Sequence, residues 1–388
     1  MHQMKKLAIV VTHPIQYYAP VFKLLAQQVE LMVFYTWGEA SLNKHDPGFG
    51  KTIQWDIDLL NGYSFTWVKN IATDAGSHHS KGIINPDLIA QIESWGADTV
   101  LVYGWWYQSH FKVLRHFKNK VPVLFRGDST LVDEKSGIKS ILKIFYLRWV
   151  YSHINYALYT GTNNKAYFKK YGVTDDQLIF APHAVDNDRY GITDQKKIAA
   201  IRQNLSLTNN DILLLFAGKF EAKKDPLLLL QAFINLNLPG LHLLFVGNGD
   251  LEAQLKQLAG TNKHIHFMDF QNQSRMPAIY QACDLFCLPS KGPGETWGLA
   301  VNEAMACSKA ILVSDKVGCA ADLVKNNLNG FIHQSGSLAD ITQKLAMLVA
   351  KQKNGLALMG RASHDIIKHW NFELQADHII NYEQVNAI

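Results

Sequence analysis

The chain alternates short, continuous apolar runs with longer segments in which apolar residues recur at helical spacing. Uninterrupted runs rich in valine, isoleucine and leucine are typical of strands in parallel sheets whose two faces are covered by helices. The pattern therefore predicts an α/β, doubly wound fold. The expected strands are Leu7–Thr12, Leu31–Tyr35, Thr99–Tyr103, Val121–Phe125, Tyr156–Tyr159, Ile212–Ala217, Leu241–Val246, Ile265–Phe267, Leu285–Leu288 and Ala310–Ser314.

The strands fall into two series, which predicts two Rossmann-like domains. The first series ends near Asp186, and a polar helix over Gln195–Leu205 precedes the second. We therefore expect domains over 1–190 and 191–369, and a final helix within 370–388 that crosses back onto the first domain. Ligands of such sheets bind beyond the carboxyl ends of the strands, so two facing domains would enclose a cleft.

Composition narrows the classes of protein. An apolar content of 48% and a charged content of 18% over 388 residues are typical of a folded protein. A net charge of +5 favours an anionic ligand and is too small to indicate nucleic-acid binding. No signal peptide or membrane span is recognised, so a cytoplasmic location is expected. No CxxC pair is present, and the cysteines are expected to be reduced and buried: Cys283, Cys287, Cys307 and Cys319.

Two loops in the second half carry candidates for binding a phosphate group. Lys219 and Lys224 follow the strand Ile212–Ala217 near the start of a helix, where lysines and backbone N–H groups can neutralise a diphosphate. Gly247 and Gly249 follow the next strand and permit close approach of the backbone to a ligand. A solvated charged loop is the alternative for the lysines, and taken alone the favoured one. A plain tight turn explains the glycines equally well.

A third loop is rich in glycine and proline and places Glu295 ahead of a helix that contains Glu303. At a rise of 1.5 Å per residue the two carboxylates would lie about 12 Å apart, roughly the distance from the sugar to the ribose of a nucleotide sugar. The helix N-terminus between them favours a diphosphate. This segment is therefore predicted to bind a nucleotide sugar, with further contacts from Thr296, Trp297, Gly298 and Leu299.

The run from Glu295 to Glu303 resembles the E-x7-E motif of retaining GT-B glycosyltransferases of family 4, the glycosyl transferases group 1. The resemblance implies that Glu295 contacts the donor sugar, Glu303 the ribose, and Lys219 and Lys224 the diphosphate. Lys219 stands where arginine is commoner in the family. Other similar segments are Cys283-Asp284, Pro289-Ser290, Glu303-Ala304-Met305-Ala306, Val313-Ser314-Asp315 and Asn329-Gly330-Phe331.

The first half resembles a branch of the same family that opens with a His-Pro-Ile-Gln segment, here beginning at His13. His13 is a candidate for a hydrogen bond to a phosphate or acceptor, with a structural role as the alternative. After the strand Val121–Phe125, Arg126 is a candidate for binding an anionic group and Asp128 for orienting or deprotonating the acceptor hydroxyl. An Arg–Asp ion pair that ties the loop is the alternative. Many family members carry a histidine at this strand end, and this chain does not.

Three further segments bear on membranes and metals. The helix expected over Ile138–Tyr151 interleaves basic and aromatic residues and is compatible with an anionic membrane surface, although a half-buried core helix is favoured. Asp56-Ile57-Asp58 has the D-x-D pattern that metal-dependent sugar transferases of a different fold use. Because polar and apolar residues alternate around it, we interpret it as the edge of a strand and assign no metal. His78-His79 lacks a nearby third ligand in the sequence. No metal and no cofactor are expected.

The sequence therefore predicts a retaining glycosyltransferase that moves a sugar from a nucleotide-sugar donor to a glycan or lipid-linked acceptor in polysaccharide or lipopolysaccharide synthesis. UDP is the expected nucleotide because it is frequent in the family, and a peripheral membrane contact is compatible with the basic helix. One alternative is a non-catalytic, nucleotide-sugar-binding subunit of a glycan-assembly complex. A weaker alternative is an NAD-dependent oxidoreductase, because Gly247-Asn248-Gly249 lacks the third glycine of that motif.

Overall fold

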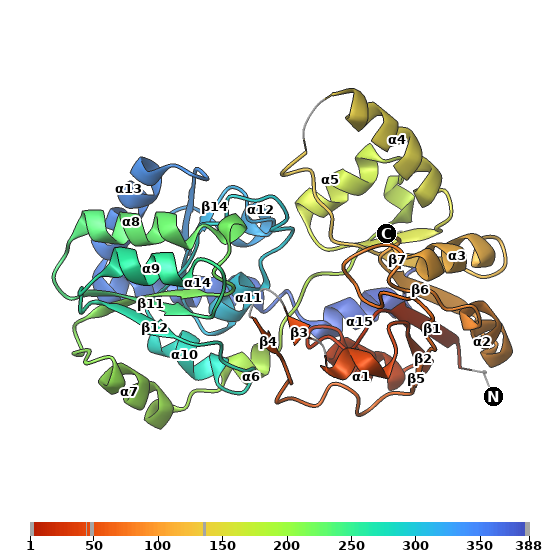
Figure 1. Cartoon of the computed structure of the whole chain (residues 1–388), viewed down its shortest axis with the longest axis horizontal. Helices are drawn as coiled ribbons and strands as arrows, with labels where there is room; N and C mark the ends of the chain where they lie inside the picture. Colours follow the sequence, from red (N-terminus) through yellow and green to blue (C-terminus); the bar gives the residue numbers. More distant parts are fainter. Residues whose placement is uncertain (1–3, 44, 47–49, 135–136, 385–388) are drawn as a thin grey trace. The chain divides into compact units, whose positions relative to one another are not determined.

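The computed structural model describes residues 4–43, 45–46, 50–134 and 137–384 (Figure 1). The fold divides into two compact units, the first formed by Met1–Lys44, Ile57–His183 and Phe372–Ile388, and the second by His45–Asp56 and Ala184–Asn371. The division falls before Ala184 rather than near residue 190.

The short helix α6 (Asn187–Gly191) explains this position of the division, because its hydrogen bonds are made within the second unit. The Asn187 amide donates to the carbonyl oxygen of Ile367 at 3.2 Å, and Gln281 donates to the carbonyl oxygen of Tyr190 at 2.7 Å. The segment that follows Ala184 is therefore fastened to the second unit.

The first unit is built on a parallel sheet with the strand order β5-β2-β1-β6-β7-β8-β9. The interiors of the longer strands are buried, as their continuous apolar runs predict. Strands β5 and β9 were not predicted because each has only three residues. The strands are β1 (Lys6–Val11), β2 (Glu30–Tyr35), β5 (Phe65–Trp67), β6 (Thr99–Tyr103), β7 (Val123–Arg126), β8 (Tyr156–Tyr159) and β9 (Leu178–Phe180).

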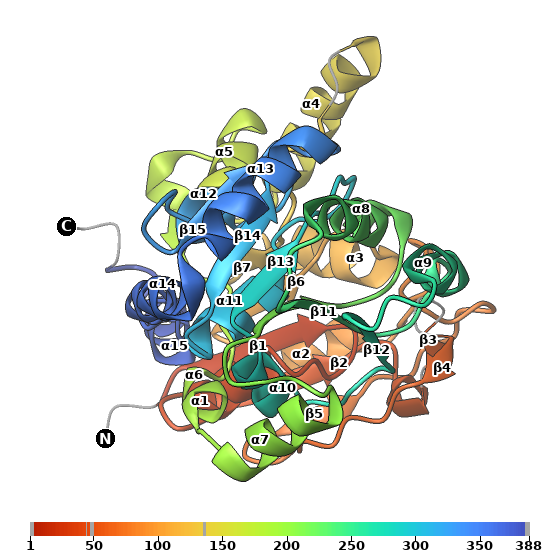
Figure 2. The same cartoon turned by 90° about the vertical axis from the view of Figure 1, so that its left-hand side faces the viewer.

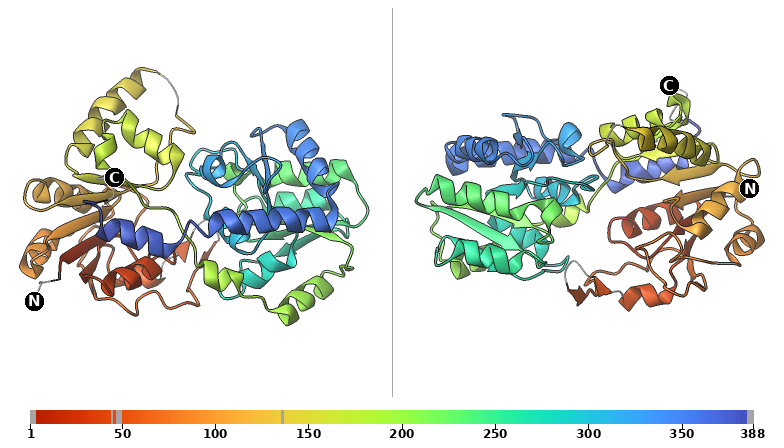
Figure 3. Two further views of the ribbon diagram at one scale, coloured as in Figure 1. Left: turned by 180° about the vertical axis from the view of Figure 1, so that it is seen from behind. Right: turned by 45° about the horizontal axis from the view of Figure 1, so that its top comes forward.

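A C-terminal helix returns to this unit, as the sequence predicts. Helix α15 packs against α1 (Figures 1 and 3). His378 Nδ1 lies 2.5 Å from the carbonyl oxygen of Phe180, and the hydroxyl of Tyr382 lies 3.3 Å from that of Thr99. The helices of the unit are α1 (Ala19–Ala26), α2 (Leu88–Trp95), α3 (Gln108–Phe117), α4 (Ile138–Tyr151), α5 (Thr162–Lys170) and α15 (Phe372–Ile380), with short 3-10 turns η1 (Glu39–Asn43) and η2 (Asp175–Gln177).

Helix α4 has the predicted bounds, but the expectation of a half-buried core helix is wrong. Only Leu147, Val150 and Tyr151 of this helix are buried. Apolar residues occur around most of its circumference, so the pattern alone could not show that a narrow edge faces the core. Its exposed large apolar side chains are Ile138, Ile141, Leu142, Phe145, Tyr146 and Trp149. No helix among the described residues is long and apolar enough to cross a membrane.

The second unit contains a parallel sheet with the order β12-β11-β10-β13-β14-β15. Connections leave β10 and β13 in opposite directions, so their carboxyl ends mark the switch point at which doubly wound sheets bind ligands. A separate antiparallel pair is formed by β3 (His45–Asp46) and β4 (Lys51–Thr52). The six strands are β10 (Ile212–Ala217), β11 (Leu241–Val246), β12 (Ile265–Met268), β13 (Leu285–Leu288), β14 (Ala310–Ser314) and β15 (Gly330–His333).

Helices cover both faces of this sheet (Figure 2). Helix α8 contacts α9 and α13, whereas α11 contacts α10 and α14. The remaining elements are α6, α7, α12 and the 3-10 turn η3, which carries Lys224. Their bounds are α7 (Gln195–Asn204), η3 (Ala222–Lys224), α8 (Pro226–Leu236), α9 (Glu252–Ala259), α10 (Met276–Ala282), α11 (Leu299–Ala306), α12 (Ala320–Leu323), α13 (Leu338–Val349) and α14 (Gln352–Ile367).

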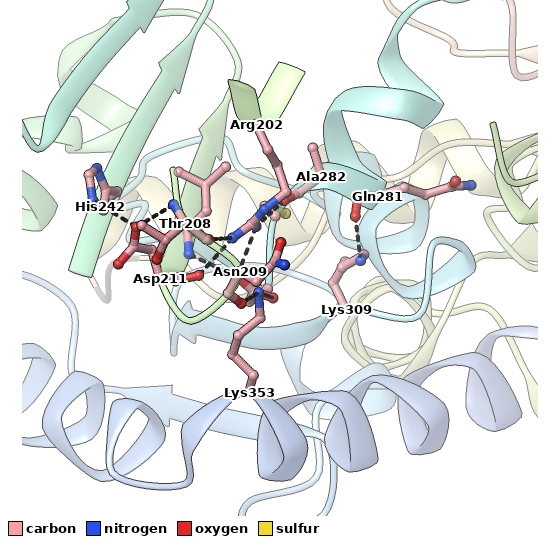
Figure 4. Close-up of polar contacts among 12 residues, drawn as sticks. Arg202, Thr208, Asn209, Asp211, His242, Gln281, Ala282, Lys309 and Lys353 are labelled. Atoms are coloured by element: carbon pink, nitrogen blue, oxygen red, sulfur yellow. Dashed lines mark hydrogen bonds and ion pairs between the residues drawn. The ribbon is translucent and has the colours of Figure 1, made fainter. Parts of the chain in front are cut away.

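A polar network fastens α7 to the amino ends of the strands (Figure 4). The Arg202 guanidinium donates to the carbonyl oxygens of Ala282 and Asp211, both at 2.8 Å, and to that of Thr208 at 3.2 Å. It also pairs with Asp284 at 3.4 Å, and Asp284 accepts the backbone N–H of Leu213 at 2.9 Å. The network lies at the opposite edge of the sheet from the carboxyl ends.

Candidate functional site

The most tightly bonded pair among the predicted residues is Lys224 and Glu295. Lys224 Nζ lies 2.6 Å from Glu295 Oε2, and the two side chains are 16% and 9% exposed. The Ser290 hydroxyl donates to the same carboxylate oxygen at 3.0 Å. The pair joins the segments that follow β10 and β13, two strands that are neighbours in the sheet. An ion pair therefore lies at the switch point of the second unit.

Lys219 lies half-buried directly after β10, on the same edge of the sheet. The side chain of Lys224 packs over the backbone of this segment, because a Cβ placed at Gly218 would lie 3.4 Å from Lys224 Cδ. Both predicted lysines thus belong to the carboxyl end of one strand. Positive charge gathered at a strand end suits an anionic ligand.

Gly247 and Gly249 permit a close approach, but the group that approaches is protein backbone. A Cβ at Gly247 would lie 2.0 Å from the carbonyl oxygen of Gly218, and one at Gly249 would lie 2.6 Å from that of Phe220. Phe220 also donates its N–H to the carbonyl oxygen of Asn248 at 2.9 Å. These two glycines are therefore explained by the packing of the loops after β10 and β11.

The loop before α11 sets the entry of that helix. Gly298 is the N-cap residue with φ of 94°, a left-handed conformation that glycine adopts without strain. Trp297 is buried, donates to Asn302 Oδ1 at 2.9 Å, and packs against Trp370 with the rings tilted by 35° and their centroids 5.2 Å apart. Packing therefore accounts for Trp297, while Thr296 and Leu299 are half-buried beside it.

Glu303 lies on α11 and is 4% exposed. The hydroxyl of Tyr280 on α10 donates to Glu303 Oε2 at 2.8 Å. The distance of about 12 Å predicted between the carboxylates of Glu295 and Glu303 assumed that one helix joins them. It does not apply, because Glu295 lies in the loop and the helix begins only at Leu299. The two glutamates therefore reach their positions through a left-handed turn at Gly298 and only one turn of helix.

The first unit has a cavity of about 190 Å³ at the carboxyl ends of β1, β6 and β7. Arg126 and Asp128 line it, as does His183. The sequence marks Tyr107, which follows the strand Thr99–Tyr103, as a candidate for stacking on a sugar ring, with packing as the equal alternative. Sequence reasoning missed Tyr18 and Tyr103, although Tyr103 ends a predicted strand, as ligand-binding positions do. The lining residues are Val11, Thr12, Ile15, Tyr18, Tyr103, Gly104, Tyr107, Arg126, Gly127, Asp128 and His183.

Arg126 is buried and donates to the carbonyl oxygen of Ala181 at 2.7 Å. Burial and the nearby Arg126 charge hold the pKa of His183 well below its usual range, so this histidine is neutral. Burial raises the pKa of Tyr18 to about 12, although Arg126 opposes this shift. Arg126 therefore stands among neutral, hydrogen-bonding groups, with the exposed Asp128 nearby along the chain.

His13 is half-buried beside this cavity and shares a hydrogen bond of 2.8 Å between its Nδ1 and Thr12 Oγ1. Its ring meets Trp37 edge-on, with centroids 5.5 Å apart. A second histidine supports the same region from inside. His110 Nε2 lies 2.8 Å from Thr36 Oγ1, and burial lowers the pKa of His110 to about 4.

Two metal-related predictions need correction. Asp56, Ile57 and Asp58 form no strand; Asp56 accepts the N–H of Ser274, while Asp58 caps the turn at Leu60 and Asn61.

The second correction concerns His78 and His79, which do have a third partner, because the loop folds back onto Asp74. The Nε2 atoms of His78 and His79 lie 3.1 and 3.2 Å from Asp74 Oδ2. His79 Nδ1 accepts the N–H of Lys81, which leaves the proton on Nε2 and favours a hydrogen-bonded loop.

Residues 197–363 match the family model described as glycosyl transferases group 1. These residues form a group 1 glycosyltransferase domain. The group 1 domain contains the sheet from β10 to β15 and every candidate residue from Lys219 to Glu303. The four cysteines also lie in it, and all are buried and free, as predicted.

Curated relatives of the group 1 domain transfer sugars. The chain is 26% identical over 241 residues to a D-inositol 3-phosphate glycosyltransferase of Rhodococcus erythropolis, covering 59% of this chain and 53% of the relative. It is 30% identical over 129 residues to the N,N'-diacetylbacillosaminyl-diphospho-undecaprenol alpha-1,3-N-acetylgalactosaminyltransferase of Campylobacter jejuni, covering 33% of each. The matched segments thus span about half the length of these relatives or less.

The likeness in fold extends beyond the group 1 domain. The Anabaena protein HepE, solved in complex with UDP, superposes with a TM-score of 0.72 over 98% of this chain and 99% of that one. The sequence identity is 16%, so the comparison concerns the fold. The chain has the GT-B fold, with two Rossmann-like units, as the sequence predicts.

Proposed function

We propose that this protein is a retaining glycosyltransferase that moves a sugar from a nucleotide-sugar donor to a glycan or lipid-linked acceptor. The observation that carries the proposal is the Lys224–Glu295 pair at the switch point of a group 1 domain. An isolated structural ion pair requires no particular place in a sheet, whereas a ligand site of a doubly wound sheet requires this one.

The donor contacts follow from the hydrogen-bonding capacity of each group. The Lys224 ammonium has three donors and uses one on Glu295, so two can serve a diphosphate. Lys219 and the first N–H groups of α11 add positive potential at the same edge. Glu295 keeps acceptor capacity for sugar hydroxyls, and Glu303 for the ribose. UDP is the proposed nucleotide, supported by the structural relative solved with UDP.

The proposed reaction needs no covalent intermediate. The bond between the anomeric carbon and the diphosphate oxygen breaks, and the acceptor oxygen bonds to the same face of that carbon. The lysines stabilise the departing diphosphate. The acceptor proton passes to a base, for which Asp128 of the first unit is our candidate. This assignment rests on the place of Asp128 just after β7 and on the lining of the cavity of the first unit.

Calorimetry with UDP-, GDP-, ADP- and dTDP-sugars in the presence of EDTA tests the donor site. We expect one nucleotide to bind, Glu303→Ala to abolish binding, and Glu295→Ala to act mainly on turnover. Glu252→Ala is the matched control, because this glutamate lies on α9 of the same unit and pairs with Lys256 at 2.7 Å. Equal donor affinity for wild type and Glu303→Ala would contradict the site. Donor binding without turnover on any acceptor would favour the non-catalytic alternative.

We also propose a peripheral contact with the cytoplasmic face of a membrane, made by the exposed side of α4. We call the residues Ile138, Ile141, Leu142, Phe145, Tyr146 and Trp149 the α4 apolar face. Trp105 extends it, because its ring centroid lies 5.7 Å from that of Tyr146. The helix contains no acidic residue and carries Lys139, Lys143 and Arg148.

An anionic bilayer is the occupant that this composition favours. Exposed apolar side chains lower their free energy when they enter the boundary between the lipid headgroups and the acyl chains. Tryptophan and tyrosine prefer this boundary because one end of each side chain is apolar and the other polar. Each lysine or arginine near an anionic surface adds about 1 kcal/mol. Lys143 is partly neutralised by Glu134 at 3.2 Å, so Lys139 and Arg148 are the main contributors.

Co-sedimentation with vesicles tests this contact. We expect binding to vesicles that contain phosphatidylglycerol and much weaker binding to pure phosphatidylcholine. Phe145→Ser, at a side chain that is 68% exposed, should weaken binding at least tenfold, and Leu358→Ser on α14, which is 59% exposed, should not. Equal binding of wild type and Phe145→Ser would refute the assignment of α4, and equal binding to both lipids would refute the anionic preference.

A further inference from the structure

The cavity of the first unit contains a buried positive charge that is only partly compensated. Arg126 is 3% exposed, and its Nη atoms donate to the carbonyl oxygens of Ala181 at 2.7 Å and Pro182 at 3.4 Å. Its Nε has no hydrogen-bond partner within the part of the chain that the structure describes. A buried charge is costly unless it is paired, and neutral carbonyl groups compensate it only in part.

The other buried groups around the cavity supply hydrogen-bond donors and no negative charge. The hydroxyl of Tyr103 is buried and has no partner among the described residues. Tyr18 hydrogen-bonds Arg126, and its pKa, raised to about 12 by burial, keeps it protonated. His183 is neutral, since its pKa is lowered by burial and by Arg126. The buried part of the cavity therefore surrounds the Arg126 charge with N–H and O–H groups. The carboxylate of Asp128 also lies on the lining, but it is exposed, and its charge acts on Tyr18.

We propose that this cavity binds the carboxylate or phosphate group of an acidic acceptor. The inference rests on the proposed glycosyltransferase function and narrows its acceptor to an anionic class. The anion would accept hydrogen bonds from the Arg126 guanidinium and from the Tyr103 hydroxyl. Hydrogen bonds between a guanidinium and an anion are strong because both partners are charged. At about 30 Å³ per water molecule, a volume of about 190 Å³ equals about six waters, which suits one acidic sugar or headgroup.

This anion site differs from the proposed donor site in its residues. The donor diphosphate is assigned to Lys219 and Lys224 of the second unit, whereas Arg126 and Tyr103 belong to the first. A substitution in one unit can therefore be used as the control for the other.

Binding of three small probes tests the proposal: D-glucuronate, glucose 6-phosphate and, as the neutral match, D-glucose. We expect at least one acidic probe to bind the wild type ten or more times more tightly than glucose. Arg126→Gln should remove this preference, Tyr103→Phe should weaken it about threefold, and Lys224→Met should leave it unchanged. A preference for glucuronate alone identifies a carboxylate acceptor, and a preference for glucose 6-phosphate alone identifies a phosphorylated one.

Three results would overturn the proposal: no preference for either acid over glucose, a preference retained in Arg126→Gln, or one lost in Lys224→Met. If Arg126→Gln does not unfold cooperatively, Tyr103→Phe decides, and unchanged affinity for the acids then overturns the proposal. UDP binding is measured on the same samples. Absence of UDP binding by the wild type, with an intact acid preference, would contradict the donor site alone.

Discussion

Replacing Glu295 by glutamine should destabilise the second unit and yet preserve its affinity for UDP. The substitution keeps the shape of the side chain and removes the partner of a lysine that is 16% exposed. Removing one member of a buried ion pair costs about 3–5 kcal/mol, because the other charge stays buried. The exposure of Lys224 lets its ammonium reach water, so we expect the lower end, about 3 kcal/mol.

The double variant Lys224→Met/Glu295→Gln should be more stable than the single losses suggest. It removes both charges, and replacing a whole buried pair is often nearly neutral. The double-mutant cycle should therefore give a coupling free energy of about 2 kcal/mol, within the range for residues in contact. Urea unfolding of the four proteins measures it.

UDP makes the prediction sharper. In Glu295→Gln the diphosphate of UDP can supply the negative charge that Lys224 has lost, so UDP should bind this variant at least as tightly as the wild type. UDP at one hundred times its dissociation constant would then restore about 2.7 kcal/mol of stability. Additive single effects, within about 0.5 kcal/mol, or loss of UDP binding in Glu295→Gln, would refute the reasoning.

Three further outcomes are expected. Arg202→Leu should lower the free energy of unfolding by about 2 kcal/mol, because it leaves the half-buried Asp284 with only the more distant Lys353, at 3.8 Å, as a cation among the described residues. UDP affinity, measured by calorimetry, should not change, and a change would contradict the placement of the network away from the site. Burial and two neighbouring histidines lower the pKa of His242 to about 4, so up to about 3 kcal/mol of folding free energy, fully present above pH 6.5, is lost as the pH falls towards 4. Urea unfolding of wild type and His242→Gln at pH 7.5 and pH 5 should show that the stability of the variant depends less on pH. Equal losses of stability in the two proteins would contradict the assignment to His242. Gly247→Ala should lower the free energy of unfolding by about 3 kcal/mol or more, because its Cβ would meet the carbonyl oxygen of Gly218. Gly260→Ala, where the Cβ would have open space around it, should lower it by about 1 kcal/mol. Equal thermal unfolding temperatures of the two variants would contradict the steric argument.

The sequence predicted the longer strands of the two sheets because these strands are buried on both faces, whereas β5, β9 and β15 were not predicted. Thr99–Tyr103 and Ile212–Ala217 have the predicted bounds, since a continuous apolar run ends where burial ends. The three-residue strand Leu178–Phe180 is too short to leave such a signal. The length of an apolar run therefore limits what can be predicted of a parallel sheet.

The candidate site was predictable only as far as it follows strand ends. Lys224 and Glu295 follow two strands that were recognised, and the sheet brings them to 2.6 Å. Tyr103 also ends a predicted strand, but it was not named as a candidate, because an aromatic residue at that position usually packs. The exposure of Phe145 was hidden for a related reason: apolar residues around a whole helix do not reveal which side the core covers.

The return of α15 to the first unit has a consequence for synthesis on the ribosome. This helix covers α1, and Tyr382 lies beside Thr99 of β6, yet both are translated only after every residue of the second unit. The first unit therefore emerges from the ribosome with the α15-facing side of α1 uncovered, and this contact can form only after the second unit has been translated. Folding during translation should follow the reverse of the sequence order, with the second unit closing first and the first unit completed last.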